Sequence, residues 1–300
     1  MPTPDASELV GALRRTFGEH PNCRAAHAKG LVAAGTFTGS AGGARICRAE
    51  HLREGRTLSV IARFSNGSGY PDSPDWVRDR RGLAVKFGLS ADLVSISHPI
   101  YFAREPQDLV DFSRMRLRDF LAAHPNAARA IEIAQNSPPP CSYARVGYHA
   151  VHAFGLLDDD GARRWARFHW CPEAGSGPLA TAEARRRPPD YLRDELISRL
   201  TSGTSVRFEL QIELAQPGDP TADATALWEG EREHVGAGTL QLDRLAPELD
   251  EADVALVFDP TNVPDGIELS ADAVLHARAG AYRLSARERY DARNLSHGQG

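Results

Sequence analysis

Arg278 and Tyr282 are the residues from which metal chemistry could start. They are four positions apart in segment 272–290, which begins with a helical pattern, so both side chains share one helix face. A guanidinium beside a phenol favours the phenolate. A phenolate is a hard anionic ligand that suits ferric iron. Taken alone, however, the R-x-x-x-Y spacing is far more typical of an ordinary pair on a helix surface.

His27 is the second residue that could carry chemistry. It lies in "RAAHAKG", residues 24–30, between basic residues, and a strand-like run follows directly. An imidazole can both accept and donate a proton near neutral pH. These seven residues leave two interpretations open: a structural histidine at the start of a strand, or a group placed to move protons.

About eight extended segments and several helices would have to position these residues. Segment 205–215 has the clearest strand pattern, because apolar and polar residues alternate from Val206 to Leu214. Other predicted strands are 30–39, 57–67, 82–90, 92–102, 145–158, 163–172, 238–245 and 253–260, and other predicted helices are 6–18, 106–124 and 187–203. This order favours the α+β class, with an antiparallel β-barrel and helical insertions. We expect one domain over 1–300, with a helix in 1–22 and a short tail at 291–300.

Composition excludes several classes of protein. The chain has 300 residues, 42% of them hydrophobic, which is enough for a substantial core. Its net charge of −5 argues against nucleic-acid binding. No run of about 18 apolar residues occurs, so no membrane insertion is expected. Four scattered cysteines (23, 47, 141 and 171) and an N-terminus without an apolar signal region predict a cytoplasmic protein with reduced thiols.

Four stretches together resemble the haem catalase superfamily, in the order in which that family has them. They are "RAAHAKG" (24–30), "ARFSNGSGYPDSPDWVRDRRGLAVKF" (62–87), "DLVSISHPIYFAREP" (92–106) and "FDPTNVPDGIELSADAVLHARAGAY" (258–282). The second is similar to the family's R-F-S block, which ends in R-D-x-R-G-x-A-V-K-F, and the fourth to its F-D-P-x-N-x-P-x-G-I-E block. The resemblance covers nearly the whole chain. It implies an eight-stranded antiparallel barrel with haem, expected to be haem b, buried beside it.

The resemblance also implies a role for each matching residue. His27 matches the distal histidine, which moves a proton between the two peroxide oxygens, and Ser65 matches the serine that orients it. Tyr282 matches the ligand of the haem iron, and Arg278 its charge partner. The matches to residues that contact the rest of the haem are Arg24, Arg63 and Arg289 at the propionates, and Ala26 where the family has a valine against the haem face.

Two departures from the large catalases shape the expected function. Large catalases have a long N-terminal arm and a C-terminal helical domain, whereas here the distal histidine is residue 27 and the chain ends 18 residues after Tyr282. We therefore expect a small catalase-related peroxidase that is a monomer or a homodimer. Large catalases also place an asparagine in the distal pocket, and alignment on Pro99 puts Ile96 at that position. A shift of one residue would bring Ser97 there instead, and His98 is another polar candidate.

Isoleucine has no hydrogen-bond donor for peroxide, and the loss of one positioned donor costs about 10²–10³ in rate. We therefore expect a haem peroxidase that reduces hydrogen peroxide or organic hydroperoxides with a small organic electron donor, with weak catalase activity at most. One alternative is a catalase-like enzyme that rearranges fatty-acid hydroperoxides or tailors a specific small molecule. An alternative of another class is a haem-binding protein without turnover.

Overall fold

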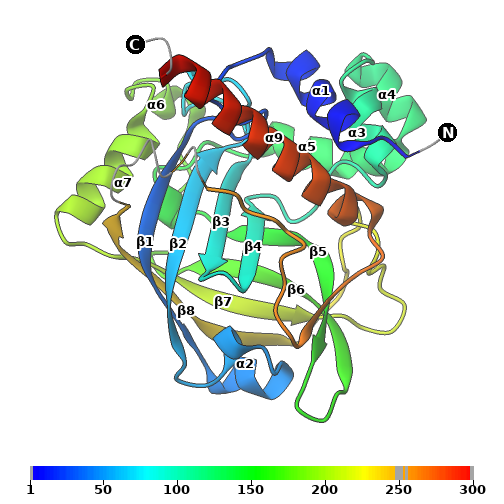
Figure 1. The fold of residues 1–300 in the computed structure, drawn as a ribbon, viewed down its shortest axis with the longest axis vertical. Coiled ribbons are helices and arrows are strands. Elements are labelled where there is room, and N and C mark those ends of the chain that lie inside the picture. Colours follow the sequence, from blue (N-terminus) through cyan, green and yellow to red (C-terminus); the bar gives the residue numbers. More distant parts are fainter. Residues whose placement is uncertain (1–2, 247–252, 254–255, 298–300) are drawn as a thin grey trace.

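Eight antiparallel strands form a closed barrel at the centre of the molecule, as the sequence predicts (Figure 1). The computed structural model describes residues 3–246, 253 and 256–297. The strands of the barrel are β1 (Gly30–Gly39), β2 (Thr57–Asn66), β3 (Arg81–Phe87), β4 (Ala91–Ile96), β5 (Tyr148–Leu157), β6 (Arg163–Pro172), β7 (Val206–Leu214) and β8 (His234–Leu245). Their order is β4-β3-β2-β1-β8-β7-β6-β5, and pairing of Ile96 with His149 closes the ring between β4 and β5. A short strand, β9 (Ile267–Leu269), pairs with β5.

Large apolar side chains fill the inside of the barrel. Along β7 the residues from Val206 to Leu214 alternate between buried and partly exposed, which matches the pattern read from the sequence. Phe37, Phe87 and Trp170 meet inside, with the ring centres of Phe37 and Phe87 5.2 Å apart. An eight-stranded barrel is just wide enough for its side chains to fill. The functional site therefore has to lie outside the barrel wall.

An irregularity in β5 changes which way its side chains face. Ala150 pairs with Phe168, and Phe154 pairs with Ala166. Between these two pairs, β5 advances by four residues while β6 advances by only two. Strict alternation would place His152 on the same face as Ala150 and Phe154, which lie in the barrel core. The irregular register instead lets His152 bond to Asp272 and Arg278, which belong to the helical layer.

Helices cover the outside of the barrel. They are α1 (Ala6–Phe17), α2 (Ala41–Ile46), α3 (Pro106–Phe112), α4 (Leu117–Ala123), α5 (Ala128–Asn136), α6 (Thr181–Ala184), α7 (Tyr191–Thr201) and α9 (Ala273–His297). Short 3₁₀ turns occupy Glu50–Leu52, Pro125–Ala127 and Tyr143–Arg145. The long α9 runs across the barrel, with α1 beside it and α3, α4 and α5 grouped near α1 (Figure 1). None of the described helices has both the length and the apolar character of a membrane span.

The N-terminal helix begins with a capping box. Asp5 accepts a hydrogen bond from the backbone N–H of Glu8, and the Glu8 carboxylate accepts one from the N–H of Asp5. A helix packed here brings apolar residues of α1 to the site cavity described below.

Three expectations about elements were wrong. Segment 106–124 forms two helices, because Arg116 is extended and starts a new helix after Phe112. Segment 253–260 is not a strand: residues 256–259 have no regular structure, and their apolar side chains line the site cavity instead of pairing in the sheet. The expected tail at 291–300 is helical as far as His297, because residues 291–297 contain no glycine or proline.

Candidate active site

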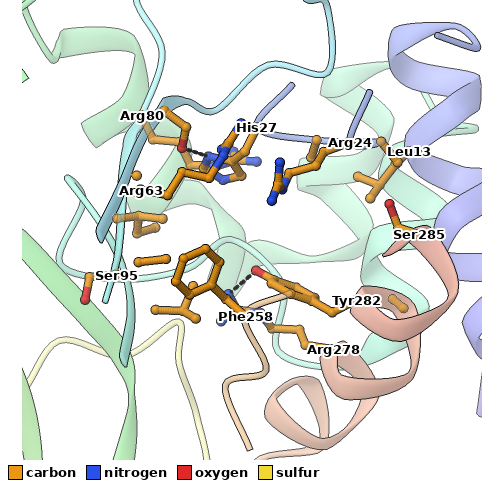
Figure 2. A pocket seen from close by; sticks show the side chains of 18 of the residues that line it. Leu13, Arg24, His27, Arg63, Arg80, Ser95, Phe258, Arg278, Tyr282 and Ser285 are labelled. Atoms are coloured by element: carbon orange, nitrogen blue, oxygen red, sulfur yellow. Dashed lines mark hydrogen bonds between the residues drawn. The ribbon is translucent and has the colours of Figure 1, made fainter. Parts of the chain in front are cut away.

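A large cavity lies between the barrel wall, α1 and α9. It encloses about 1290 Å³ of atom-free space, counted out into the open solvent at its mouth. Figure 2 shows His27, Arg80, Arg63 and Arg24 on one side of this space and Tyr282, Arg278 and Phe258 on the other. We call the side with His27 the distal wall and the side with Tyr282 the proximal wall.

His27 and Ser65 form a hydrogen-bonded pair on the distal wall. The Nδ1 atom of His27 lies 2.9 Å from the Oγ atom of Ser65, which is on β2. His27 has a positive φ of 57°, a conformation that is uncommon outside glycine and costs energy unless the surroundings enforce it. Its backbone N–H donates to the carbonyl of Gly67, which holds the segment in this conformation. The structure therefore brings together the two residues that the sequence proposed as catalytic.

The environment keeps His27 neutral. Burial lowers the pKa of His27 well below its ordinary value, and the positive charge of Arg80, followed by that of Arg63, lowers it further. A neutral imidazole that donates from Nδ1 to Ser65 has an unprotonated Nε2. The distal wall can therefore present a proton acceptor at neutral pH.

Gly82, on β3, leaves the space that this pair needs. A Cβ atom at this position would lie 2.6 Å from Ser65 Oγ and 2.9 Å from His27 Nδ1. Any side chain there would have to displace one partner of the pair. The close approach of Ser65 and His27 therefore explains the glycine at position 82, in the R-D-x-R-G stretch.

Arg80 is a distal residue that the sequence reasoning missed. It precedes Gly82 by two positions and lines the same cavity, whereas the side chain of Arg81 turns away and donates to the carbonyls of Asp75 and Val77. The Nε atom of Arg80 is buried and has no hydrogen-bond partner among the described residues. Arg80 lies directly before β3 (Arg81–Phe87), so strand alternation gave no signal for it.

Tyr282 and Arg278 pair on α9, as their spacing predicts. Arg278 Nη2 donates to Tyr282 Oη over 2.7 Å, and Arg278 Nη1 lies 2.8 Å from His152 Nε2. His152 Nδ1 in turn lies 2.7 Å from Asp272 Oδ2. Asp272 is fully buried and accepts two backbone N–H groups at the start of α9 with its other oxygen. His152 and Asp272 were not identified from the sequence.

The direction of these hydrogen bonds follows from their donors and acceptors. Burial alone would raise the pKa of Asp272, but the hydrogen bond from His152 lowers it, so the carboxylate only accepts. Burial lowers the pKa of His152, so the ring is neutral, donates from Nδ1 and accepts at Nε2. Burial would also lower the pKa of Arg278, yet the nearby Tyr282, Tyr101 and Asp272 raise it. Arg278 therefore donates to both neighbours, and Tyr282 Oη is the acceptor at the end of the chain.

Three arginines, Arg24, Arg63 and Arg289, form a cluster near the cavity together with the carboxylate of Asp253. Arg63 binds Asp253 through Nε and Nη2, at 2.5 and 2.9 Å, and Arg24 Nη1 binds the same carboxylate at 2.6 Å. Arg289, on α9, lies in the same electrostatic cluster. Burial first, and the charge of Arg63 second, lower the pKa of Arg24 well below its ordinary value and that of Arg289 to about 10. The cluster is therefore short of negative charge.

Ala26 and Ile96 also line the cavity, and Ile96 is 7% exposed. Ser97 does not line it: its Oγ accepts the backbone N–H of Arg81 over 2.9 Å. His98 is buried outside the lining, with its Nε2 unpartnered among the described residues. Burial lowers the pKa of His98 to about 4. Of the alternatives left open by the sequence, the structure brings Ile96 to the cavity wall.

The residues present fit a haem. A tetrapyrrole needs apolar walls, an axial ligand and partners for two propionates. The cavity has apolar walls, and Tyr282 Oη is held as an acceptor beside Arg278. Among the described residues of this cluster, the guanidiniums of Arg24, Arg63 and Arg289 and the carboxylate of Asp253 leave a net charge of two positive units. Two propionates, each with one negative charge, would neutralise it. The buried Nε atom of Arg289 has no hydrogen-bond partner among these residues and is available to an anion.

Comparison with known proteins agrees with this geometry. The family model for catalase matches residues 10–297. A catalase-related peroxidase of Mycolicibacterium paratuberculosis is 36% identical, over 96% of this chain and 95% of its own length. One of Synechococcus elongatus is 31% identical, over 94% of this chain and 87% of its own.

A fungal catalase crystal structure superposes with a TM-score of 0.80 at 25% identity, over 90% of this chain and 60% of the fungal one. The catalase of Pseudomonas aeruginosa is 29% identical over 61% of its own length. The chain thus spans nearly the full length of the small relatives but only part of these large ones. The protein is an oxidoreductase that acts on peroxide, and its chain belongs to the catalase family.

Proposed function

We propose that this protein is a haem-dependent peroxidase that reduces hydrogen peroxide or organic hydroperoxides with a small organic electron donor. One observation carries the proposal: the neutral His27–Ser65 pair and the Arg278–Tyr282 pair occupy opposite walls of one cavity (Figure 2). When bound between these walls, haem would supply the iron centre at which the peroxide O–O bond is cleaved heterolytically.

The proximal residues hold the cofactor. Tyr282 Oη is the iron ligand in this proposal, and Arg278 Nη2 donates a hydrogen bond to it. Arg24, Arg63 and Arg289 pair with the propionates. The His152–Asp272 bond keeps Arg278 aligned because it orients the nitrogen that Arg278 donates to.

The distal residues move a proton. His27 Nε2 takes the proton from the inner peroxide oxygen, and the imidazolium returns it to the departing oxygen. Burial and the charge of Arg80 lower the pKa of His27, so the imidazolium gives the proton up readily. Ser65 holds the ring in the orientation that both transfers need.

Ile96 supports peroxidase over catalase turnover. Its side chain offers no donor where large catalases have an asparagine, and it adds to an apolar lining that includes Leu9, Leu109 and Val151. An apolar cavity accommodates organic and fatty-acid hydroperoxides as well as hydrogen peroxide. Rearrangement of a fatty-acid hydroperoxide is the second candidate, and the same lining favours it.

The test is one spectrum and three assays on the purified holoprotein. We expect a Soret band, slow oxygen release from hydrogen peroxide alone, and fast oxidation of a dye donor with either hydrogen peroxide or a fatty-acid hydroperoxide. Strong oxygen release would refute the preference for peroxidase, and product from the fatty-acid hydroperoxide without a donor would favour rearrangement. Haem without any turnover would identify a haem-binding protein. Absence of haem after expression with adequate iron would refute the proposal.

A Tyr282→Phe variant tests the ligand. It should lose or weaken haem binding, and unchanged haem content and spectrum would disprove the assignment.

The same proposal includes haem b as the haem type, a cytoplasmic location and a role in oxidative stress. It also includes a single domain over 1–300 and a monomeric or homodimeric state. The four cysteines, which are all free, support a reducing compartment.

A further inference from the structure

Three side chains on neighbouring strands connect the site cavity to the outer face of the barrel. His149 on β5 lines the cavity, and its Nδ1 atom lies 2.6 Å from Nδ1 of His169 on β6. His169 Nε2 lies 2.8 Å from Oε2 of Glu213 on β7. The side chains of His169 and Glu213 are 15% and 14% exposed. This series of three hydrogen-bonded side chains therefore begins in the cavity and ends at the surface.

The acceptor at the outer end sets the direction of every bond in this chain. The hydrogen bond from His169 lowers the pKa of Glu213, although burial opposes it, so the carboxylate accepts from His169 Nε2–H. When His169 carries its single ring proton on Nε2, its Nδ1 atom has a lone pair that accepts from His149 Nδ1–H. His149 Nε2 is left with a lone pair and has no hydrogen-bond partner among the described residues. The network thus makes His149 a proton acceptor toward the cavity.

Burial and nearby positive charges keep the His149 ring neutral at neutral pH. Burial lowers the pKa of His149 to about 3, with further lowering by His169, by His98 after β4 and by Arg167 on β6, while Glu213 acts in the opposite direction.

Further groups face the outer end of the chain. Arg232 Nε lies 3.7 Å from Glu213 Oε1, and the ring of His234 on β8 lies 6.1 Å from that of His169. Both would help a proton leave for solvent once it reaches Glu213.

We propose that His149 is a second proton-accepting residue of the cavity, which deprotonates phenol-type donors and passes the proton through His169 to Glu213. The inference rests on the proposed peroxidase function and names its donor class. The balance is ROOH + 2 ArOH → ROH + H₂O + 2 ArO•. Each phenol O–H bond breaks, its proton goes to His149 Nε2, and its electron reduces the peroxide, which is the oxidant of the proposed function. His149 then gives its Nδ1 proton to His169, which gives its Nε2 proton to Glu213.

Two donors separate this role from a structural one. Guaiacol loses a proton when it is oxidised, whereas ferrocyanide loses only an electron. In the holoprotein, His149→Leu should lower kcat/KM for guaiacol by about 10²-fold, the lower range for loss of a general base, and leave ferrocyanide oxidation unchanged. Glu213→Gln should act in the same direction with a smaller fall. Glu209→Gln, four positions earlier on β7 and bonded to Gln211 instead, is the matched control and should change neither rate.

A binding measurement gives a readout apart from turnover. 4-Nitrophenol bound to the wild-type holoprotein should ionise at a higher pH than when bound to the His149→Leu variant, because a hydrogen bond to the neutral His149 Nε2 stabilises the phenol over the phenolate; the phenolate absorbance follows this ionisation. An equal loss with both donors would mean that His149 is structural, and no loss with either would mean that it is not used. Failure of the wild type to oxidise either donor with peroxide would instead refute the proposed function itself.

Discussion

Replacing Asp272 tests whether the proximal network stabilises both the fold and the site. Asp272→Ala removes an acceptor of two backbone N–H groups at the start of α9, at 2.9 and 3.2 Å, which corresponds to a helix cap of about 1 kcal/mol. It also leaves the buried His152 Nδ1–H without its partner at 2.7 Å, a loss of about 1–3 kcal/mol. The free energy of unfolding should fall by about 2–4 kcal/mol, a large part of the roughly 5–15 kcal/mol of a typical protein.

Thermal unfolding followed by circular dichroism measures this loss. A change of 1 kcal/mol shifts Tm by about 2–4 °C in proteins of 150–250 residues, so we expect a fall of roughly 4–16 °C. Asp158→Ala is the matched control, because Asp158 also accepts two backbone N–H groups but bonds to no histidine. It should cost about 1 kcal/mol. Equal shifts for the two variants would refute the contribution of the buried histidine bond.

Asp272→Asn separates two roles of Asp272: capping the start of α9, and setting the direction of the hydrogen bonds through His152 and Arg278. Asparagine caps a helix about as well as aspartate. If its oxygen accepts the backbone N–H groups, its NH₂ group faces His152 Nδ1, which must then accept. The proton of His152 moves to Nε2 and opposes the N–H of Arg278. We expect a milder loss of stability than with alanine, together with weaker haem retention and a changed spectrum. A wild-type spectrum and haem affinity in this variant would contradict the assigned directions.

Three further perturbations probe the site and the core. Gly82→Ala should abolish peroxide turnover with little change in Tm, because the new Cβ would lie 2.6 Å from Ser65 Oγ and 2.9 Å from His27 Nδ1; activity near wild type would show that the pair can move aside. Ile96→Asn should raise oxygen release from hydrogen peroxide by about 10²-fold, measured with an oxygen electrode, by restoring a donor to the distal wall; no rise would mean that another group limits catalase turnover. Burial lowers the pKa of His51 to about 4, so the unfolded state binds its proton first, and stability is lost as pH falls from about 6.5 through 4, by up to about 3 kcal/mol. Denaturant titrations at several pH values should show a shallower acid loss for His51→Leu, and equal slopes would exclude this residue as the cause.

The strand pattern and the residue pair on α9 could be predicted because both depend on neighbours in the sequence. Alternation along β7 defines its buried face, and the four-residue spacing of Arg278 and Tyr282 defines a shared helix face. The pairing of His27 with Ser65 came from resemblance to a family, since 38 residues separate the two partners. The break between α3 and α4 depends on a local turn that the helical pattern of 106–124 does not reveal.

The tertiary structure alone decided which further polar groups join the site. His152 faces Arg278 only because β5 is irregular, and alternation would have placed it in the barrel core. His149 and His169 meet only because β5 and β6 pair in that register. A sequence pattern reports which face of an element is apolar, and it carries no information on which faces of distant elements meet. The sequence therefore indicated the barrel, the distal pair and the Arg278–Tyr282 pair, while strand register and packing determined the hydrogen-bond networks behind them.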